Sequence, residues 1–196
     1  MLAMPLVAVL ARIGVTPTAI TLFGLALNIA AGVCIGTGRT VLGGVVLLLA
    51  SICDGLDGAL ARRLDRVTKF GAFLDSTIDR IAETVVLAGV AAYFIWHPGS
   101  LADALWGVVA LLALGGSLIT SYARARAEGL GMECKVGWFE RPERMVVTIL
   151  GLLLGHRALV AALSILTVFS WFTVLQRIRH VQRLTARTPG SGAASD

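Results

Sequence analysis

Long apolar segments separated by short polar linkers are the feature that most constrains the fold of this 196-residue chain. Hydrophobic residues make up 57% of the sequence and the mean hydropathy is +0.83, well above the range of ordinary soluble domains. A membrane-spanning helix needs about 20 apolar residues, so the chain has room for about six. The segments that we expect to span the membrane cover approximately residues 18–36, 41–63, 70–96, 101–127, 142–154 and 156–183.

The two ends of the chain differ from these segments. Residues 1–14 are short and apolar, and we expect a juxtamembrane helix that lies on the membrane surface. Residues 184–196 are small and polar, which predicts a disordered tail after a single membrane domain over 1–183. Gly32 and Gly36 are four residues apart, a spacing that indicates a close contact between helices.

The positive charges gather at one end of the expected helices. All of the 17 lysines and arginines except Arg39 and Arg157 lie at this end. Because positively charged residues stay on the cytoplasmic side, we expect both termini to be cytoplasmic. The net charge of +5 then reflects membrane topology and an anionic headgroup surface, and it argues against a nucleic-acid partner.

Four aspartates interrupt the apolar pattern at the cytoplasmic ends of the second and third segments. Asp54 and Asp57 are three residues apart on one expected helix, and Asp75 and Asp79 are four apart on the next, so each pair shares a helix face. The short polar linker between the two helices predicts that they are antiparallel neighbours. Carboxylates at the edge of a membrane are costly unless they face a wet cavity and hold a cation. The pattern therefore predicts a metal site.

Such a site suggests phosphate chemistry. Oxygen ligands select hard cations, and Mg²⁺ or Mn²⁺, as two ions, could clamp a pyrophosphate. Asp79 could accept a proton from an attacking hydroxyl, Arg62 is suited to a phosphate contact, and Gly58 would let a ligand approach the backbone. In the alternative interpretation, Arg62, Arg63 and Arg80 merely neutralise the aspartates in interhelical ion pairs.

The pattern D-x2-D-G-x2-A-R-x8-G-x3-D-x3-D resembles the signature of the CDP-alcohol phosphatidyltransferases. The chain fills it without departure with Asp54, Asp57, Gly58, Ala61, Arg62, Gly71, Asp75 and Asp79. The resemblance implies a six-helix membrane enzyme, usually a homodimer, with a polar cavity open to the cytoplasm. Such enzymes transfer a substituted phosphate from a CDP-alcohol to a second alcohol and release CMP.

The resemblance also implies roles for individual residues. The metal ligands would be Asp54, Asp57, Asp75 and Asp79, and Asp79 would also be the catalytic base. The CDP moiety would contact Thr18, Thr21, Gly58, Arg62 and Thr68. For Thr18 and Thr21, capping of a helix is an equally good explanation.

The segments 121–128 and 140–144 are similar to the phosphatidylinositol-phosphate synthase branch and its archaeal relatives. By this resemblance the phosphate of the acceptor would be bound by Arg124, Arg144 and Arg177. The chain departs from the inositol branch in carrying Arg124 where lysine is more usual. We interpret the adjacent Arg126 and Arg141 as plain signals of cytoplasmic topology.

We therefore expect an all-α integral membrane transferase that uses CDP-diacylglycerol, with myo-inositol 1-phosphate as the favoured acceptor and phosphatidylinositol phosphate as the product. Within the same class, the alternatives are a phosphatidylglycerophosphate synthase and an archaetidylinositol phosphate synthase. An alternative from another class is a divalent-cation transporter. A transporter should carry acids deep in several spans and an internal repeat, and the sequence has neither.

Overall fold

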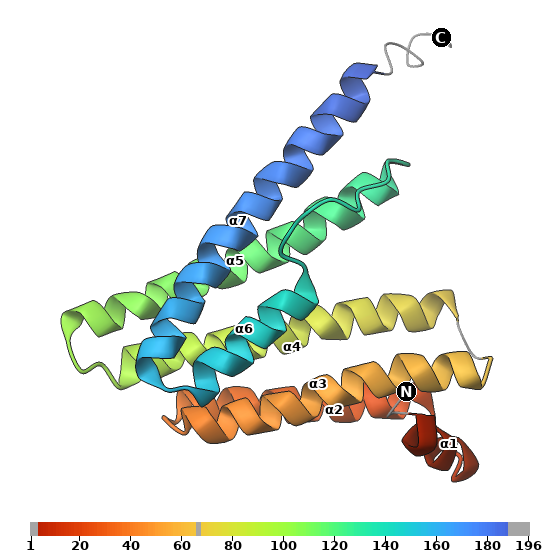
Figure 1. Ribbon diagram of the computed structural model, residues 1–196, viewed down its shortest axis with the longest axis horizontal. Coiled ribbons are helices and arrows are strands. Elements are labelled where there is room, and N and C mark those ends of the chain that lie inside the picture. Colours follow the sequence, from red (N-terminus) through yellow and green to blue (C-terminus); the bar gives the residue numbers. More distant parts are fainter. Residues whose placement is uncertain (1–3, 66–67, 188–196) are drawn as a thin grey trace.

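The computed structural model describes residues 4–65 and 68–187, and all regular secondary structure in this part of the chain is helical (Figure 1). The prediction of an all-α fold is confirmed, and the helices follow the expected segments closely. They are α1 (Met4–Arg12), α2 (Pro17–Gly36), α3 (Thr40–Arg63), α4 (Lys69–Trp96), α5 (Leu101–Gly129), α6 (Arg141–Leu153) and α7 (His156–Arg187). Because α7 continues to Arg187, the first four residues of the predicted tail are helical. The rest of that tail lies outside the described residues.

Threonine caps mark the starts of two helices. The hydroxyl oxygen of Thr16 accepts a hydrogen bond from the Ala19 amide at 3.2 Å at the start of α2. Thr68 does the same for the Gly71 amide at 2.9 Å at the start of α4. Each cap satisfies one of the amides that have no partner in the first turn of a helix.

Four of the described helices are long and apolar enough to cross a membrane, by length and composition: α2, α3, α5 and residues 156–186 of α7. The α4 helix is also long, but the part from Lys69 to Glu83 carries charged residues, among them Asp75 and Asp79. The α6 helix has 13 residues. At 1.5 Å per residue it measures about 20 Å, less than the hydrocarbon core of a bilayer.

The α2 helix packs against both α3 and α4, whereas α3 and α4 do not pack on each other (Figure 1). Among the described residues, no Cα atom of α3 comes within 8 Å of a Cα atom of α4. The prediction that these two helices are direct neighbours is therefore wrong. The physical reason is that both use α2 as their packing partner, which leaves a space between them.

Glycines allow the close approach of α2 and α4. A Cβ atom placed on Gly32 would lie 2.7 Å from the carbonyl oxygen of Val85, and one placed on Gly89 would run into the backbone of Gly32. A Cβ atom on Gly36 would meet Ala92 at an ordinary 3.6 Å. The helix contact predicted from Gly32 and Gly36 is confirmed, with α4 as the partner.

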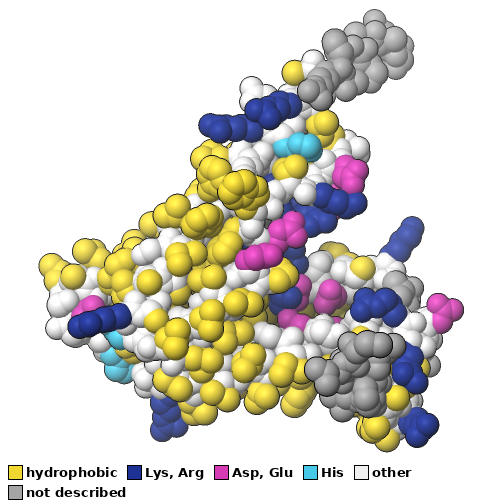
Figure 2. Space-filling view, viewed as in Figure 1, with side chains coloured by type: hydrophobic (Ala, Val, Ile, Leu, Met, Phe, Trp, Pro, Cys, Tyr) yellow, Lys and Arg dark blue, Asp and Glu magenta, His cyan; other side chains and the backbone are white. Residues whose placement is uncertain are grey.

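The α1 helix packs on α3, and α5, α6 and α7 form a second arm. The α5 and α7 helices pack against each other, α5 also contacts α4, and α6 contacts α3 and α7. One continuous core joins the two arms, and its fully buried members include Leu47, Phe94, Leu152 and Leu163. Beyond this core the arm of α5 and α7 diverges from α2–α4 (Figure 1), and acidic and basic side chains gather where the arms separate (Figure 2). This open end contains the candidate site.

Candidate active site

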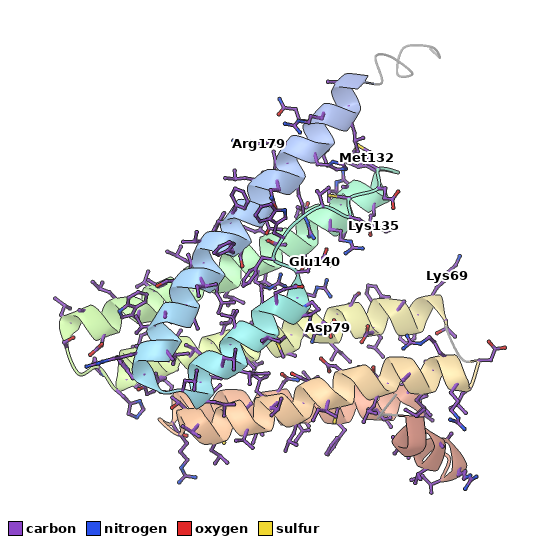
Figure 3. All side chains as sticks on the ribbon, viewed as in Figure 1. Lys69, Asp79, Met132, Lys135, Glu140 and Arg179 are labelled. Carbon is purple, nitrogen blue, oxygen red and sulfur yellow. The ribbon has the colours of Figure 1, made fainter. Side chains whose placement is uncertain are left out.

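The predicted aspartates lie on both sides of the space between α3 and α4. Asp54 and Asp57 belong to the second half of α3, and Asp75 and Asp79 to the first half of α4. The α6 helix begins opposite this space. Asp79 and Glu140, the residue before α6, both lie where the two arms part (Figure 3).

Arg141, the first residue of α6, connects the two aspartate-bearing helices. Its Nη2 atom lies 2.7 Å from Oδ2 of Asp54 and 2.8 Å from Oδ1 of Asp79. Its Nε atom is buried and has no hydrogen-bond partner among the described residues. The interpretation of Arg141 as a plain topology signal is therefore wrong, because its guanidinium is part of the carboxylate site.

The ion pairs of the alternative interpretation, with Arg62, Arg63 and Arg80, are weaker or not formed among the described residues. Arg80 lies 3.6 Å from Asp79, measured from Nη1 to Oδ2, and the same Nη1 donates to the carbonyl oxygen of Ser76 at 2.8 Å. Arg62 and Arg63 are exposed at the end of α3. Neutralisation of Asp54 and Asp79 thus comes mainly from Arg141, a residue far away in the sequence.

Asp57 is buried and its carboxylate is held by two hydrogen bonds. The Thr21 hydroxyl donates to Oδ2 at 2.7 Å, and the Gly58 amide donates to Oδ1 at 2.6 Å. Hydrogen bonds of this kind are strong because the acceptor is charged, and they fix the orientation of the carboxylate. Thr21, which was predicted to contact the CDP moiety, therefore lies directly beside Asp57, a predicted metal ligand.

The other residues predicted to contact the CDP moiety lie near the start of α2, the end of α3 and the start of α4. Thr18 is exposed one turn before Thr21. Arg62 passes over Gly58, since a Cβ atom placed on that glycine would lie 3.6 Å from Arg62 Nη1. Thr68 caps α4, as described above.

The chemistry of the acidic side chains fits a hard divalent cation. Among residues 4–65 and 68–187, no three His, Cys, Asp or Glu side chains are grouped closely enough to enclose a metal ion. However, Oδ2 of Asp54 and Oδ1 of Asp79 point at one cationic atom from opposite helices. Asp57 and Asp75 supply further carboxylates from the same two helices. Such an all-oxygen donor set is the one that Mg²⁺ and Mn²⁺ prefer.

Arg144 is locked into an ion pair inside the protein. Its Nε and Nη2 atoms donate to the two oxygens of Glu83 at 2.8 and 3.2 Å, and Nη1 donates to the carbonyl oxygen of Phe139 at 3.2 Å. Arg144 is 3% exposed and Glu83 is 6% exposed. All three nitrogen atoms of the guanidinium group thus donate to protein oxygens.

The other two predicted phosphate ligands, Arg124 and Arg177, meet at Glu140. Arg124 Nη1 and Arg177 Nη2 each lie 3.6 Å from Oε1 of Glu140. Arg177 is buried and also donates to two backbone carbonyl oxygens, which fix its position. Arg124 is more exposed and pairs with Glu128 at 2.9 Å on the same helix. The structure therefore brings these two arginines together and places Arg144 in a separate pair.

A pocket of about 740 Å³ opens between α4 and α5. Its wall includes Arg80, Arg124 and Glu128, together with several hydroxyl groups, but none of the four aspartates. Arg124 thus borders both this pocket and the Glu140 cluster.

Three residues of the site were not predicted from the sequence: Glu83, Glu140 and Arg141. Glu83 had a local signal, because it is an acid in the apolar stretch that follows Asp79, and an ionisable residue within a membrane segment implies a partner. Glu140 and Arg141 looked like ordinary residues of a charged cytoplasmic loop. Only the folded chain shows which side chains they face.

The chain is similar to known proteins over most of its length. The family model for CDP-alcohol phosphatidyltransferase matches residues 14–183. An archaetidylinositol phosphate synthase of Methanothermobacter thermautotrophicus is 40% identical over 88% of this chain and 87% of its own length. A phosphatidylinositol phosphate synthase of Mycobacteroides abscessus is 37% identical over 91% of this chain and 82% of its own.

Solved structures of one related enzyme are similar over almost the whole chain. The crystal structure of Mycobacterium tuberculosis phosphatidylinositol phosphate synthase with CDP-DAG bound has a TM-score of 0.85 at 30% identity, covering 98% of this chain and 97% of that one. The same enzyme in complex with manganese and citrate also has a TM-score of 0.85, covering 98% and 92%. The chain belongs to the CDP-alcohol phosphatidyltransferase family.

Proposed function

We propose that this protein transfers the phosphatidyl group of CDP-diacylglycerol to a phosphorylated alcohol, most favourably myo-inositol 1-phosphate, and releases CMP. The observation that carries the proposal is the pairing of two charged centres at the open end. Carboxylates from α3 and α4 face one point, marked by Arg141, and Arg124 and Arg177 from the other arm meet at Glu140. The first centre suits a cation and a pyrophosphate, and the second suits a phosphomonoester.

Asp54, Asp57, Asp75 and Asp79 would hold the divalent cation, Mg²⁺ or Mn²⁺, and we propose two ions. The manganese complex of the related enzyme supports a cation of this class. When bound, such ions would neutralise the pyrophosphate of the donor and the charge that develops on CMP. Thr21 and the Gly58 amide would keep Asp57 oriented, and Thr18, Arg62 and Thr68 would contact the CDP moiety.

Asp79 is the proposed base. Its carboxylate would accept the proton of the acceptor hydroxyl as the hydroxyl oxygen attacks the β-phosphorus of the donor. The new phosphorus–oxygen bond forms as the bond from that phosphorus to the oxygen of CMP breaks, with the entering and leaving oxygens in line. The position of Asp79, facing the space between α3 and α4, supports this role.

The acceptor is proposed from the arginines and the relatives together. Two guanidinium groups that meet at one carboxylate oxygen provide the positive charge that a dianionic phosphate needs. Arg144 would support this region from its buried pair. The relatives are named for inositol phosphate lipids of either tail type, so archaetidylinositol phosphate remains an alternative product. Glycerol 3-phosphate, giving phosphatidylglycerophosphate, is the alternative acceptor.

For the membrane arrangement we propose six spans, α2 to α7, with α1 on the surface and both termini cytoplasmic. The four long apolar helices support this arrangement. The charged half of α4 would then face the polar site, and the short α6 would cross only part of the bilayer. A homodimer is proposed from the family resemblance. Because the chain belongs to a transferase family, the alternative of a divalent-cation transporter is no longer favoured.

The test is CMP release by the purified protein with CDP-diacylglycerol and Mg²⁺, comparing inositol 1-phosphate, free inositol and glycerol 3-phosphate. We expect turnover with inositol 1-phosphate and none with free inositol, which lacks the phosphate. A preference for glycerol 3-phosphate would keep the chemistry and replace the acceptor. Absence of CMP with every acceptor, in folded protein also tried with CDP-archaeol, would contradict the proposed reaction.

A further inference from the structure

Arg141 occupies the point at which the carboxylates of α3 and α4 converge. Its Nη2 atom is within 2.8 Å of both Asp54 Oδ2 and Asp79 Oδ1. A divalent cation bound by the same two oxygens would lie about 2.0–2.1 Å from each if it were Mg²⁺. The guanidinium nitrogen and the cation would then fill the same space with the same sign of charge.

We propose that Arg141 is an internal competitor of the divalent cation, and that the cation binds to Asp54 and Asp79 only as the guanidinium of Arg141 leaves them. This inference rests on the proposed function, since it assumes that the aspartates are cation ligands. It assigns to Arg141 a role in setting cation affinity. In the same step, cation binding releases a guanidinium group at the open end of the site.

The bonds of Arg141 are compatible with such an exchange. Its Nε atom is buried and has no hydrogen-bond partner in the described part of the chain, so the present position leaves one donor unused. Its side chain is 24% exposed, so it is not fully enclosed by protein. Arg141 is the first residue of α6, so its side chain projects from the end of the helix that is next to the loop.

Two nearby arginines provide matched comparisons. Arg144, one turn further along α6, is 3% exposed and makes a two-pronged bond to Glu83, so it is not free to exchange. Arg80 is near the same carboxylate as Arg141, but at 3.6 Å and on Asp79 alone. Arg80 therefore has the charge of a competitor without its position.

The first experiment measures Mn²⁺ binding by electron paramagnetic resonance in the purified wild type, Arg141→Gln and Arg80→Gln, with no nucleotide or lipid substrate. If the guanidinium competes, we expect Arg141→Gln to bind Mn²⁺ about tenfold more tightly. Arg80→Gln should change the affinity by less than about twofold, because an exposed charge at that distance contributes little.

The outcomes separate this inference from the proposed function. Equal or weaker Mn²⁺ binding by Arg141→Gln would overturn the competition, and so would equal tightening in both variants, which would indicate a general charge effect. In either of these two cases, Mn²⁺ binding by the wild type would still be consistent with the proposed function. Failure of every protein to bind Mn²⁺ would contradict the proposed function as well.

A second measurement uses the unmodified sequence, so that it does not depend on the folding of a variant. Phenylglyoxal labels accessible guanidinium groups, and mass spectrometry of the peptides locates the label. We expect labelling of Arg141 to rise at least about threefold when Mn²⁺ is added, while Arg144 stays unlabelled because of its buried pair with Glu83. Unchanged or reduced labelling of Arg141 with saturating Mn²⁺ would overturn the inference.

Discussion

Glu83 and Arg144 join α4 to α6 across a gap that the backbones do not close. The two side chains share two hydrogen bonds of 2.8 and 3.2 Å, although no Cα atoms of the described parts of α4 and α6 come within 8 Å of each other. Removing one partner of a buried ion pair leaves the other charge without compensation. This pair therefore links α4 directly to α6, in addition to the shared apolar core and the packing of α4 on α5.

Replacement of Glu83 should consequently destabilise the protein. We expect Glu83→Gln to lower the free energy of unfolding by about 3–5 kcal/mol, because Arg144 would keep its charge in a buried site without a counterion. Thermal unfolding of the detergent-solubilised protein measures the effect. The control is Glu128→Gln, which breaks the exposed pair with Arg124 and should cost about 0–1 kcal/mol. Equal losses in the two variants would contradict this account of the buried pair.

Asp79→Asn should abolish most of the transfer reaction and leave the fold intact. An amide cannot accept the proton of the acceptor hydroxyl, so we expect CMP formation to fall by at least about 100-fold. CDP-diacylglycerol binding should change far less, because the other three aspartates remain. Asp103→Asn is the control, since Asp103 pairs with His156 at 3.2 Å on another part of the molecule. Turnover close to the wild-type value in Asp79→Asn would rule out the base assignment.

Arg124 and Arg126 provide a test of the acceptor site within a single turn of α5. Arg124 meets Arg177 at Glu140, whereas Arg126 is exposed. We expect Arg124→Ala to raise the KM for inositol 1-phosphate by about tenfold through loss of a charge-assisted phosphate contact, with the KM for CDP-diacylglycerol unchanged. Arg126→Ala should leave both values near those of the wild type. Steady-state CMP release at varied acceptor concentration measures both, and similar effects in the two variants would contradict the assignment.

The contact between α2 and α4 can be tested with two glycine substitutions. A Cβ atom at Gly89 would collide with the backbone of Gly32, so Gly89→Ala should force the helices apart and lower the unfolding temperature. Gly55→Ala is the matched control, because nothing lies within 4 Å of the Cβ position there. Alanine is the better helix former by about 1 kcal/mol, so this control should be unchanged or slightly more stable. A lower unfolding temperature in Gly55→Ala alone would contradict the packing described here.

The sequence allowed the helices to be predicted well, because their limits depend on local signals. Thr16 and Thr68 cap the starts of α2 and α4, and polar turns separate the apolar segments. The faces that carry the two aspartate pairs also follow from helical spacing alone. Packing was harder to predict. A short linker suggested that α3 and α4 are in contact. Instead, α4 packs against α2, because glycines on α2 and α4 allow their backbones to approach closely.

The partners within the site could not be predicted for a related reason. Arg141 bonds to Asp54 across 87 residues of sequence, and Arg144 bonds to Glu83 across 61. Neither pairing leaves a trace in local periodicity, since each depends on where α6 begins relative to α3 and α4. A positive charge near the cytoplasmic end of a span satisfies the topology rule in any orientation, so the rule does not distinguish Arg141 from Arg126.

The division of the site between two arms has a consequence for evolution. Asp54, Asp57, Asp75 and Asp79 belong to helices that share α2 as their packing partner, whereas Arg124 and Arg177 belong to α5 and α7, which pack on each other. Substitutions that accumulate on α5 and α7 can therefore change the alcohol that is recognised without disturbing the carboxylates. A duplicated gene could acquire a new lipid headgroup by divergence of one arm, with only the start of α6 constrained by both.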